Sequence, residues 1–123
     1  MDCCGTHLIA DLYDCDGLDD LALIETALRD AVVAIGATLI DIRLHKFGEG
    51  GGVTGVALLA ESHISIHSWP EHGYAAIDLF VCGAGQDIDA GAKVIAERLS
   101  AGRQEVERLA RGERVLDLAR RDP

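Results

Sequence analysis

The chain has 123 residues, of which 49% are hydrophobic, and a formal net charge of −10 at pH 7. This length predicts one domain, and this apolar content predicts a buried core and excludes a disordered chain. The acidic balance argues against a nucleic-acid partner, because phosphates are bound by concentrated Lys and Arg. No apolar run reaches the about 18 residues of a membrane-spanning helix, and the first residues show no basic and apolar leader.

The cysteines and the charge give two further expectations. Cys3, Cys4, Cys15 and Cys82 occur without an export leader, which predicts reduced thiols and a cytoplasmic protein. Cys3 and Cys4 are too close in sequence for an ordinary structural disulfide. The acidic excess lies before residue 103, and such a body attracts a cationic small molecule, although solubility alone also accounts for it.

The first third of the chain predicts a strand, a helix and a strand. Apolar residues alternate over 7–15, which is typical of a strand. Helical spacing over 21–35, with an N-cap at Asp16 and a stop at Gly36, predicts the first helix. Alternation over 37–47 predicts the second strand. One of its faces would carry Leu39, Asp41, Arg43 and His45.

The middle of the chain predicts three more strands. A glycine loop at 48–52 precedes a strand at 53–62, apolar enough to be central in a sheet. Strands at 63–69 and 74–82 follow, and the PEHG turn at 70–73 joins them as a hairpin.

The last part predicts a helix over 87–100 with Gly102 as its stop, whereas 103–121 fits either an edge strand with a basic tail or a helix. Only two helices are clearly predicted, and strands joined as hairpins lie between them in the chain. This order predicts an α+β two-layer sandwich, with an antiparallel sheet and both helices on one face. Nothing else in the chain covers the other sheet face, so a homodimer that stacks its sheets is expected.

The segment AESHISIHSWPEHGYAAIDLFVCG, residues 60–83, concentrates reactive side chains. His63, Ser65 and His67 share one face of their strand, and Ser62 belongs to the opposite face. Each alone is most simply a satisfied strand residue or a small buried one. Their number in one short segment predicts a functional site without naming a reaction. The site would draw on Glu61, Ser62, His63, His67, Glu71, His72 and Cys82.

Three chemistries fit parts of this set. A serine hydrolase would use Ser62, but a glycine-flanked nucleophile turn and an orienting acid are both missing. Cys82 and His67 would form a nucleophile pair. A metal site would match no common zinc spacing, and we expect none. Its ligands would come from His63, His67, His72, Glu61 and Cys82.

At these residues the chain resembles the prokaryotic S-adenosylmethionine decarboxylase proenzymes, the short, pyruvoyl-dependent class. The resemblance extends to about residue 110, and its most specific parts are GTHLIADLYDC, HKF and GVTGVALLAESHISIHSWPEHGYAAIDLFVCG. It implies an α+β sandwich of the S-adenosylmethionine decarboxylase-like fold, and a homodimer with sites at the subunit contact.

The resemblance implies an inactive precursor that cuts itself between Glu61 and Ser62. The Ser62 hydroxyl would attack the Glu61 carbonyl carbon and turn the amide into an ester. β-Elimination would then release a β-chain, residues 1–61. The dehydroalanine left behind would tautomerise to an imine and lose ammonia on hydrolysis. The product is a pyruvoyl group, the expected covalent cofactor, at the start of an α-chain of residues 62–123.

The resemblance also assigns roles to side chains. Thr54 would assist cleavage through its hydroxyl, and His67 would transfer protons during it. The pyruvoyl ketone made from Ser62 would form a Schiff base with the substrate amine and take up the electrons left when CO₂ departs. Cys82 would return a proton to the α-carbon. The substrate-binding residues would be Phe47 and His67, around the adenine, and Glu71.

The implied product is decarboxylated S-adenosylmethionine, the aminopropyl donor for spermidine synthesis. Two departures from the family lie near the expected substrate. The loop after Phe47 reads GEGGGVTG without the usual proline, and the segment after Cys82 lacks the usual Pro-Trp pair. One alternative is therefore a pyruvoyl-dependent decarboxylase of ornithine or arginine, with Glu49 facing the substrate cation. Another is an unprocessed regulatory paralogue without activity.

Overall fold

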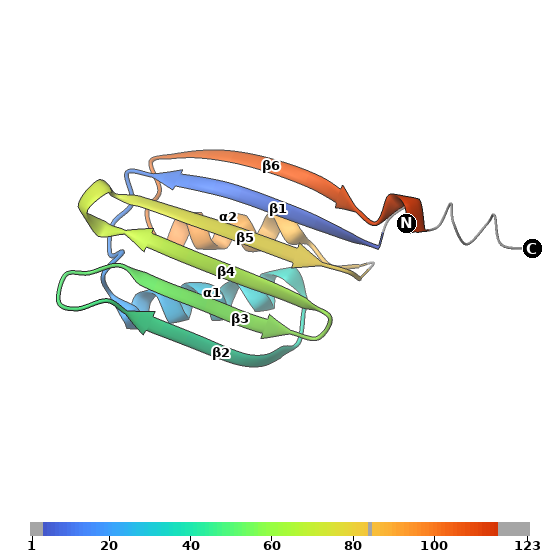
Figure 1. Ribbon diagram of the computed structural model, residues 1–123, viewed down its shortest axis with the longest axis horizontal. Coiled ribbons are helices and arrows are strands. Elements are labelled where there is room, and N and C mark those ends of the chain that lie inside the picture. Colours follow the sequence, from blue (N-terminus) through green and yellow to red (C-terminus); the bar gives the residue numbers. More distant parts are fainter. Residues whose placement is uncertain (1–3, 84, 116–123) are drawn as a thin grey trace, which may run out of the picture.

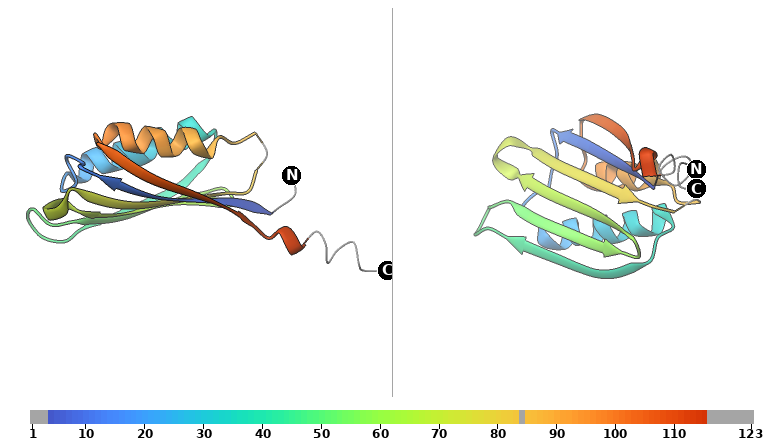
Figure 2. Two further views of the ribbon diagram at one scale, coloured as in Figure 1. Left: turned by 90° about the horizontal axis from the view of Figure 1, so that it is seen from above. Right: turned by 45° about the vertical axis from the view of Figure 1, so that its right-hand side comes forward.

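One antiparallel sheet carries two helices on a single face (Figures 1 and 2). The computed structural model describes residues 4–83 and 85–115. The strand order in the sheet is β2-β3-β4-β5-β1-β6, which confirms the expected α+β two-layer sandwich. The elements are β1 Gly5–Tyr13, α1 Leu21–Ile35, β2 Leu39–Lys46, β3 Val53–Leu59, β4 Ser62–Trp69, the short 3-10 helix η1 Pro70–His72, β5 Tyr74–Val81, α2 Ile88–Arg98 and β6 Arg103–Arg111.

The ambiguous C-terminal segment begins as a strand. β6 pairs with β1 along its whole length, from Arg103 opposite Tyr13 to Arg111 opposite Gly5. All of its side chains are exposed, which accounts for its weak apolar pattern. The basic tail expected beyond it falls largely on residues 116–123, which lie outside the described residues.

The first helix begins later than the N-cap prediction places it. Asp20, not Asp16, is the N-cap, and its carboxylate accepts a hydrogen bond from the Leu23 N–H at 3.1 Å. The Asp20 N–H donates to the Gly17 carbonyl, so a turn separates Asp16 from the helix. The predicted stop is confirmed, because Gly36 has φ +83° and its N–H caps the last turn.

The second helix ends before the predicted stop. Its last residue is Arg98 and its C-cap is Leu99. Gly102 lies instead in the connection to β6, where its N–H donates to the Tyr13 carbonyl at 2.9 Å. The start of α2 is as expected, since the Asp87 side chain accepts a hydrogen bond from the Ala90 N–H as the N-cap.

The predicted set of residues on one face of β2 is wrong at the start of the strand. An irregularity in the pairing with β3 lies between Leu39 and Asp41. As a result Leu39 packs against the core together with Ile42, while Ile40 is 67% exposed. The strand expected over 53–62 is also shorter, because β3 ends at Leu59 and Ser62 is the first residue of β4.

The core lies between the sheet and the two helices. In α2, Gly91 has no side chain, and a Cβ there would come within 2.5 Å of the Ile35 side chain on α1. Glycine therefore allows the two helices to pack closely. The largest fully buried side chains are Leu8, Leu12, Ile24, Leu28, Ile35, Val53, Ile64, Ile66, Leu79, Ile95 and Leu99.

Ser68 is a buried polar residue on the core face of β4. Its hydroxyl accepts a hydrogen bond from the Val53 N–H at 2.9 Å and donates one to the Leu18 carbonyl at 2.7 Å. It thereby ties the end of β4 to the start of β3 and to the loop before α1.

We expect Ser68→Ala to lower the free energy of unfolding by about 1–3 kcal/mol, because it leaves a buried donor and a buried acceptor without a partner. Urea unfolding measures the change. The matched control is Thr26→Ala on the exposed side of α1, which we expect to alter stability by less than about 0.5 kcal/mol. Equal stability of the two variants would contradict this role of Ser68.

Candidate active site

The face of the sheet away from the helices, which we call the open face, carries most of the candidate residues. The register of β3, β4 and β5 places His63, Ser65 and His67 there together, as predicted. Asp78 from β5 faces the same way, since it pairs with Ser65. Figure 2 shows that both helices, α1 and α2, lie on the other face of the sheet.

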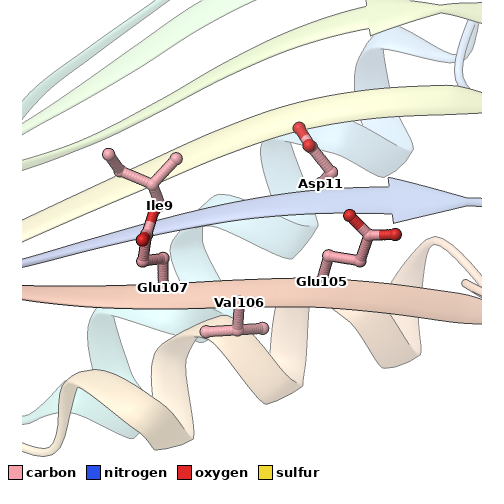
Figure 3. Close-up of a pocket in the computed structure, with 5 residues that line it drawn as sticks. All are labelled: Ile9, Asp11, Glu105, Val106 and Glu107. Atoms are coloured by element: carbon pink, nitrogen blue, oxygen red, sulfur yellow. The ribbon is translucent and has the colours of Figure 1, made fainter.

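An acidic groove runs along the open face between β1 and β6 (Figure 3). The carboxylates of Asp11, Glu105 and Glu107 lie on one side of the strands, and the Val106 side chain points to the other side. Asp11 accepts a hydrogen bond from the Tyr74 hydroxyl at 2.6 Å. This bond, with burial, raises the pKa of Tyr74 to about 12.

The turn between β3 and β4 contains the predicted cleavage position. Leu59 pairs with Ser62, so only Ala60 and Glu61 form the turn. Glu61 has φ +64°, a left-handed conformation that is rare for a residue with a side chain. Such a conformation costs roughly 1–2 kcal/mol. The peptide bond between Glu61 and Ser62 therefore follows a strained residue.

Cys82 lies directly against this turn. Its thiol donates a hydrogen bond to the Glu61 carbonyl oxygen, with Sγ 2.8 Å from the oxygen. The β4–β5 register brings them together, because His63 pairs with Phe80, and two residues further out along the two strands Glu61 comes opposite Cys82. A donor on this oxygen draws electrons from the carbonyl carbon, which makes that carbon easier to attack.

The Ser62 hydroxyl is buried and has no hydrogen-bond partner within the described residues. A buried hydroxyl without a partner loses its bonds to water with nothing in return, so such atoms are rare. No His or Asp among residues 4–83 and 85–115 holds it as a general base would. This speaks against a serine hydrolase and fits a hydroxyl that reacts once with the neighbouring carbonyl.

A second group of predicted residues meets at the other end of β3 and β4. Phe47, Thr54, His67 and Glu71 line a hollow of about 310 Å³, together with Trp69. The Thr54 hydroxyl is 3.3 Å from Nδ1 of His67. Glu49, the residue proposed for a diamino-acid substrate, is exposed and does not line this hollow.

Within one chain these two groups are far apart. Ser62 pairs with Leu59, whereas His67 pairs with Thr54 at the opposite end of the same strands. Five residues of strand separate Ser62 from His67, a distance of about 16 Å. One chain therefore does not bring His67 to Ser62, and the alternative of a Cys82–His67 nucleophile pair is not supported.

Asp78, which the sequence pattern does not single out, accepts three side-chain hydrogen bonds on the open face. Its carboxylate accepts hydrogen bonds from His7 Nε2 at 2.6 Å, from His63 Nε2 at 3.1 Å and from the Ser65 hydroxyl. Burial raises the pKa of Asp78, but these three bonds outweigh it and hold the pKa below its usual range. The signal in the sequence that could have found Asp78 is its position as an acidic residue in the middle of the otherwise apolar strand β5.

Among residues 4–83 and 85–115, His7, His63 and Asp78 form the one group of three side chains placed as metal ligands would be. Arg111 argues for a hydrogen-bond network instead. Its guanidinium, which only donates, is 3.0 Å from Nδ1 of His7. Nδ1 is then an acceptor, so Nε2 carries the hydrogen that it donates to Asp78. The metal ligand set considered from the sequence is not assembled, because His63 and His67 lie about 13 Å apart along β4.

Comparison with known proteins identifies the family. The family model described as S-adenosylmethionine decarboxylase matches residues 6–112. The chain belongs to the S-adenosylmethionine decarboxylase family. A family member from Aquifex aeolicus, an adenosylmethionine decarboxylase of known crystal structure, shares 37% of its sequence with this chain and superimposes with a TM-score of 0.82. The similarity covers 89% of this chain and 92% of that one.

Curated family members are similar over nearly their full length. An S-adenosylmethionine decarboxylase proenzyme from Methanococcus aeolicus is 50% identical over 113 residues, which are 90% of this chain and 96% of the relative. One from Thermomicrobium roseum is 45% identical over 108 residues, 88% of this chain and 93% of the relative. Both relatives carry the name of a proenzyme, a precursor that becomes active after processing.

We expect Asp78 to make stability depend on pH on the acid side. A carboxyl whose pKa is lower in the folded state stabilises the fold above its unfolded pKa, and this contribution is lost as pH falls through the folded value. Wild type should therefore be more stable than Asp78→Asn at pH 7, and the difference should shrink below about pH 4. Urea unfolding of both proteins between pH 7 and pH 3 measures it. A difference independent of pH would contradict the assigned network.

Proposed function

We propose that this chain is a self-cleaving S-adenosylmethionine decarboxylase, which supplies decarboxylated S-adenosylmethionine for spermidine synthesis. The observation that carries the proposal is the buried, unpartnered Ser62 hydroxyl next to a strained Glu61 whose carbonyl accepts a bond from Cys82. The names of the relatives favour this substrate over ornithine or arginine. The presence of all processing residues favours an active enzyme over a regulatory paralogue.

The first step of the proposed cleavage is an attack of the Ser62 oxygen on the Glu61 carbonyl carbon. The C–O bond forms, the C–N bond of the peptide breaks, and the hydroxyl proton passes to the released nitrogen. Cys82 stabilises the negative charge that develops on the carbonyl oxygen, because its S–H already points there. Release of the left-handed Glu61 backbone favours the reaction in the same direction.

The residues at this turn fit a pyruvoyl group at position 62. The buried Ser62 hydroxyl has no other bond to lose, and Cys82 lies beside the new chain end. A bound pyruvoyl group supplies an electron-withdrawing carbonyl for decarboxylation. Cys82 then holds a proton within reach of the reacting carbon, as a general acid must.

Substrate binding at Phe47, His67 and Glu71 requires a second copy of the chain. His67 lies about 16 Å from Ser62 along β4, and Phe47 and Glu71 line the hollow at the same end of the sheet. One molecule of substrate therefore does not meet both groups in one chain. A two-fold partner that covers the open face would bring the hollow of one protomer to the Ser62 and Cys82 of the other. Thr54 and His67 would then assist cleavage from the partner.

The open face offers apolar contacts for this homodimer. Ile9, Leu58 and Leu109 are each at least 40% exposed there, on strands β1, β3 and β6. Exposed side chains of this kind are typical of a surface that another molecule covers. The proposed assembly is therefore a homodimer of processed αβ units with two composite sites.

The cysteines support a cytoplasmic location, which we propose with the function. Cys4, Cys15 and Cys82 are free thiols. Burial raises the pKa of Cys15 to about 11, helped by Asp14 and Asp16, so this thiol is inert at neutral pH. Within the part of the chain that the structure describes, no helix has the length and apolar character needed to cross a membrane.

We expect Ser62→Ala to give one intact folded chain that releases no CO₂ from S-adenosylmethionine. Without the hydroxyl, neither the ester nor the prosthetic group forms. Mass spectrometry should find a fragment of residues 1–61 from wild type and only the full-length chain from the variant. The wild-type α-chain should also react with phenylhydrazine. A wild-type chain that stays intact would refute the proposed function.

We expect two inactive variants to restore activity when they share a dimer. Cys82→Ala disables one half of the composite site, and Glu71→Gln disables the other. In random mixtures half of the dimers are mixed, and each mixed dimer holds one intact site, so about a quarter of wild-type activity should return. Measuring CO₂ release from co-expressed chains tests this. No recovery would show that each site is built from one chain.

A further inference from the structure

Cleavage changes what holds position 62 in place. In the precursor, residue 62 is attached on both sides, and the turn before it is fixed by the Ala60 N–H, which donates to the Thr38 carbonyl at 3.0 Å. After cleavage His63 is the only covalent attachment of position 62, and the pairing of position 62 with Leu59 is a contact with the separate β-chain. A new chain end at the tip of a strand frays unless something holds it, so the alignment of the reactive group depends on His63.

The His63 side chain is held on the open face by two contacts. Its Nε2 donates to the Asp78 carboxylate at 3.1 Å. Its ring stacks on Phe80, with centroids 6.0 Å apart and planes 9° from parallel. Stacking lets a ring slide within its plane, whereas the hydrogen bond fixes one atom at one point. Asp78 therefore sets the position of this side chain.

Asp78 is itself fixed from two further strands. The Ser65 hydroxyl on β4 bonds to its other oxygen, and His7 on β1 donates to the oxygen that His63 uses. Arg111 on β6 keeps His7 in the tautomer that donates. The carboxylate thus joins β1, β4 and β5 three residue pairs away from the new chain end, and its hydrogen bonds leave it little freedom to move.

We propose that Asp78 is a positioning residue that holds the new end of the α-chain after self-cleavage, acting through His63. The inference rests on the proposed function and adds a residue to it. Asp78 touches neither the cleaved bond nor the substrate hollow. Its positioning role begins when the Glu61–Ser62 bond is broken, because until then the turn also holds residue 62 in place. Its hydrogen bonds contribute to the stability of the fold before cleavage as well.

The test compares Asp78→Ala and Asp78→Asn with wild type, with and without Ser62→Ala. Alanine removes every bond to the carboxylate. Asparagine keeps an oxygen for the two histidines and offers its amide to the Ser65 oxygen, so it preserves the geometry without the charge. Asp11→Ala is the matched control, an acid on the same face that bonds to Tyr74. Ser62→Ala keeps the chain uncleaved in each case.

Amide hydrogen exchange over residues 63–66 is the first measurement, and steady-state kinetics is the second. Asp78→Ala should still cleave. It should speed exchange of these amides in the cleaved protein by about tenfold or more beyond any increase in the Ser62→Ala background, where loss of the carboxylate acts only through the stability of the whole fold. Its kcat should fall by about 10- to 100-fold with little change in KM, since the reacting group is misplaced while the binding hollow is intact. Asparagine should recover most of the loss, and Asp11→Ala should match wild type in exchange.

Two results would overturn the inference. One is equal acceleration of exchange in cleaved and uncleaved proteins, which would make Asp78 an ordinary support of β4. The other is a wild-type kcat and wild-type exchange in cleaved Asp78→Ala. If Asp78→Ala does not fold, His7→Ala carries the same test, since it removes the shortest histidine bond to Asp78 without altering β4 or β5. Failure of wild type to cleave would instead refute the proposed function.

Discussion

The pairing of β4 with β5 is the constraint on which the candidate active site depends. A short turn over Pro70–His72 sets this register, and Trp69 faces Tyr74 as a result. Counting outward along the two strands brings Glu61 opposite Cys82. Because side chains alternate between faces, a slip of one residue would turn Cys82 away from the carbonyl and move His63 and His67 off the open face.

The turn at Glu61 and Ser62 combines two features that are uncommon in the rest of the fold. The helices are capped, Ser68 satisfies two buried backbone groups, and the buried apolar residues of the strands face the helices. At the turn a residue with a side chain is left-handed and a buried hydroxyl has no partner. Stability lost in this way is common where a protein performs chemistry. Here the rest of the sheet holds the strained peptide in place.

The open face combines reactive, polar and apolar residues because no helix covers it. Its polar centre is satisfied internally, since Asp78 gathers donors from β1 and β4. By contrast, the exposed apolar side chains of this face are not buried within one chain, and the hollow around His67 is not brought to Ser62 and Cys82 within one chain. A second protomer on this face would bury the exposed apolar side chains and bring the two groups of site residues together. One association would therefore serve both stability and catalysis.

The sequence by itself determined the fold class and the elements before residue 103, and it located the candidate site in residues 60–83, whereas the pattern of the last strand fits either a strand or a helix. Periodicity located the strands and helices, and the PEHG turn with strict alternation put His63, Ser65 and His67 on one face. Local signals placed the first N-cap at Asp16 and missed the irregularity in β2, because a turn at Gly17 and the pairing with β3 decide these points. Tertiary structure alone revealed the bond from Cys82 to Glu61, the network around Asp78 and the separation of Ser62 from His67. These features depend on which strands are neighbours in the sheet. A local pattern in the sequence does not specify contacts between residues that are far apart along the chain.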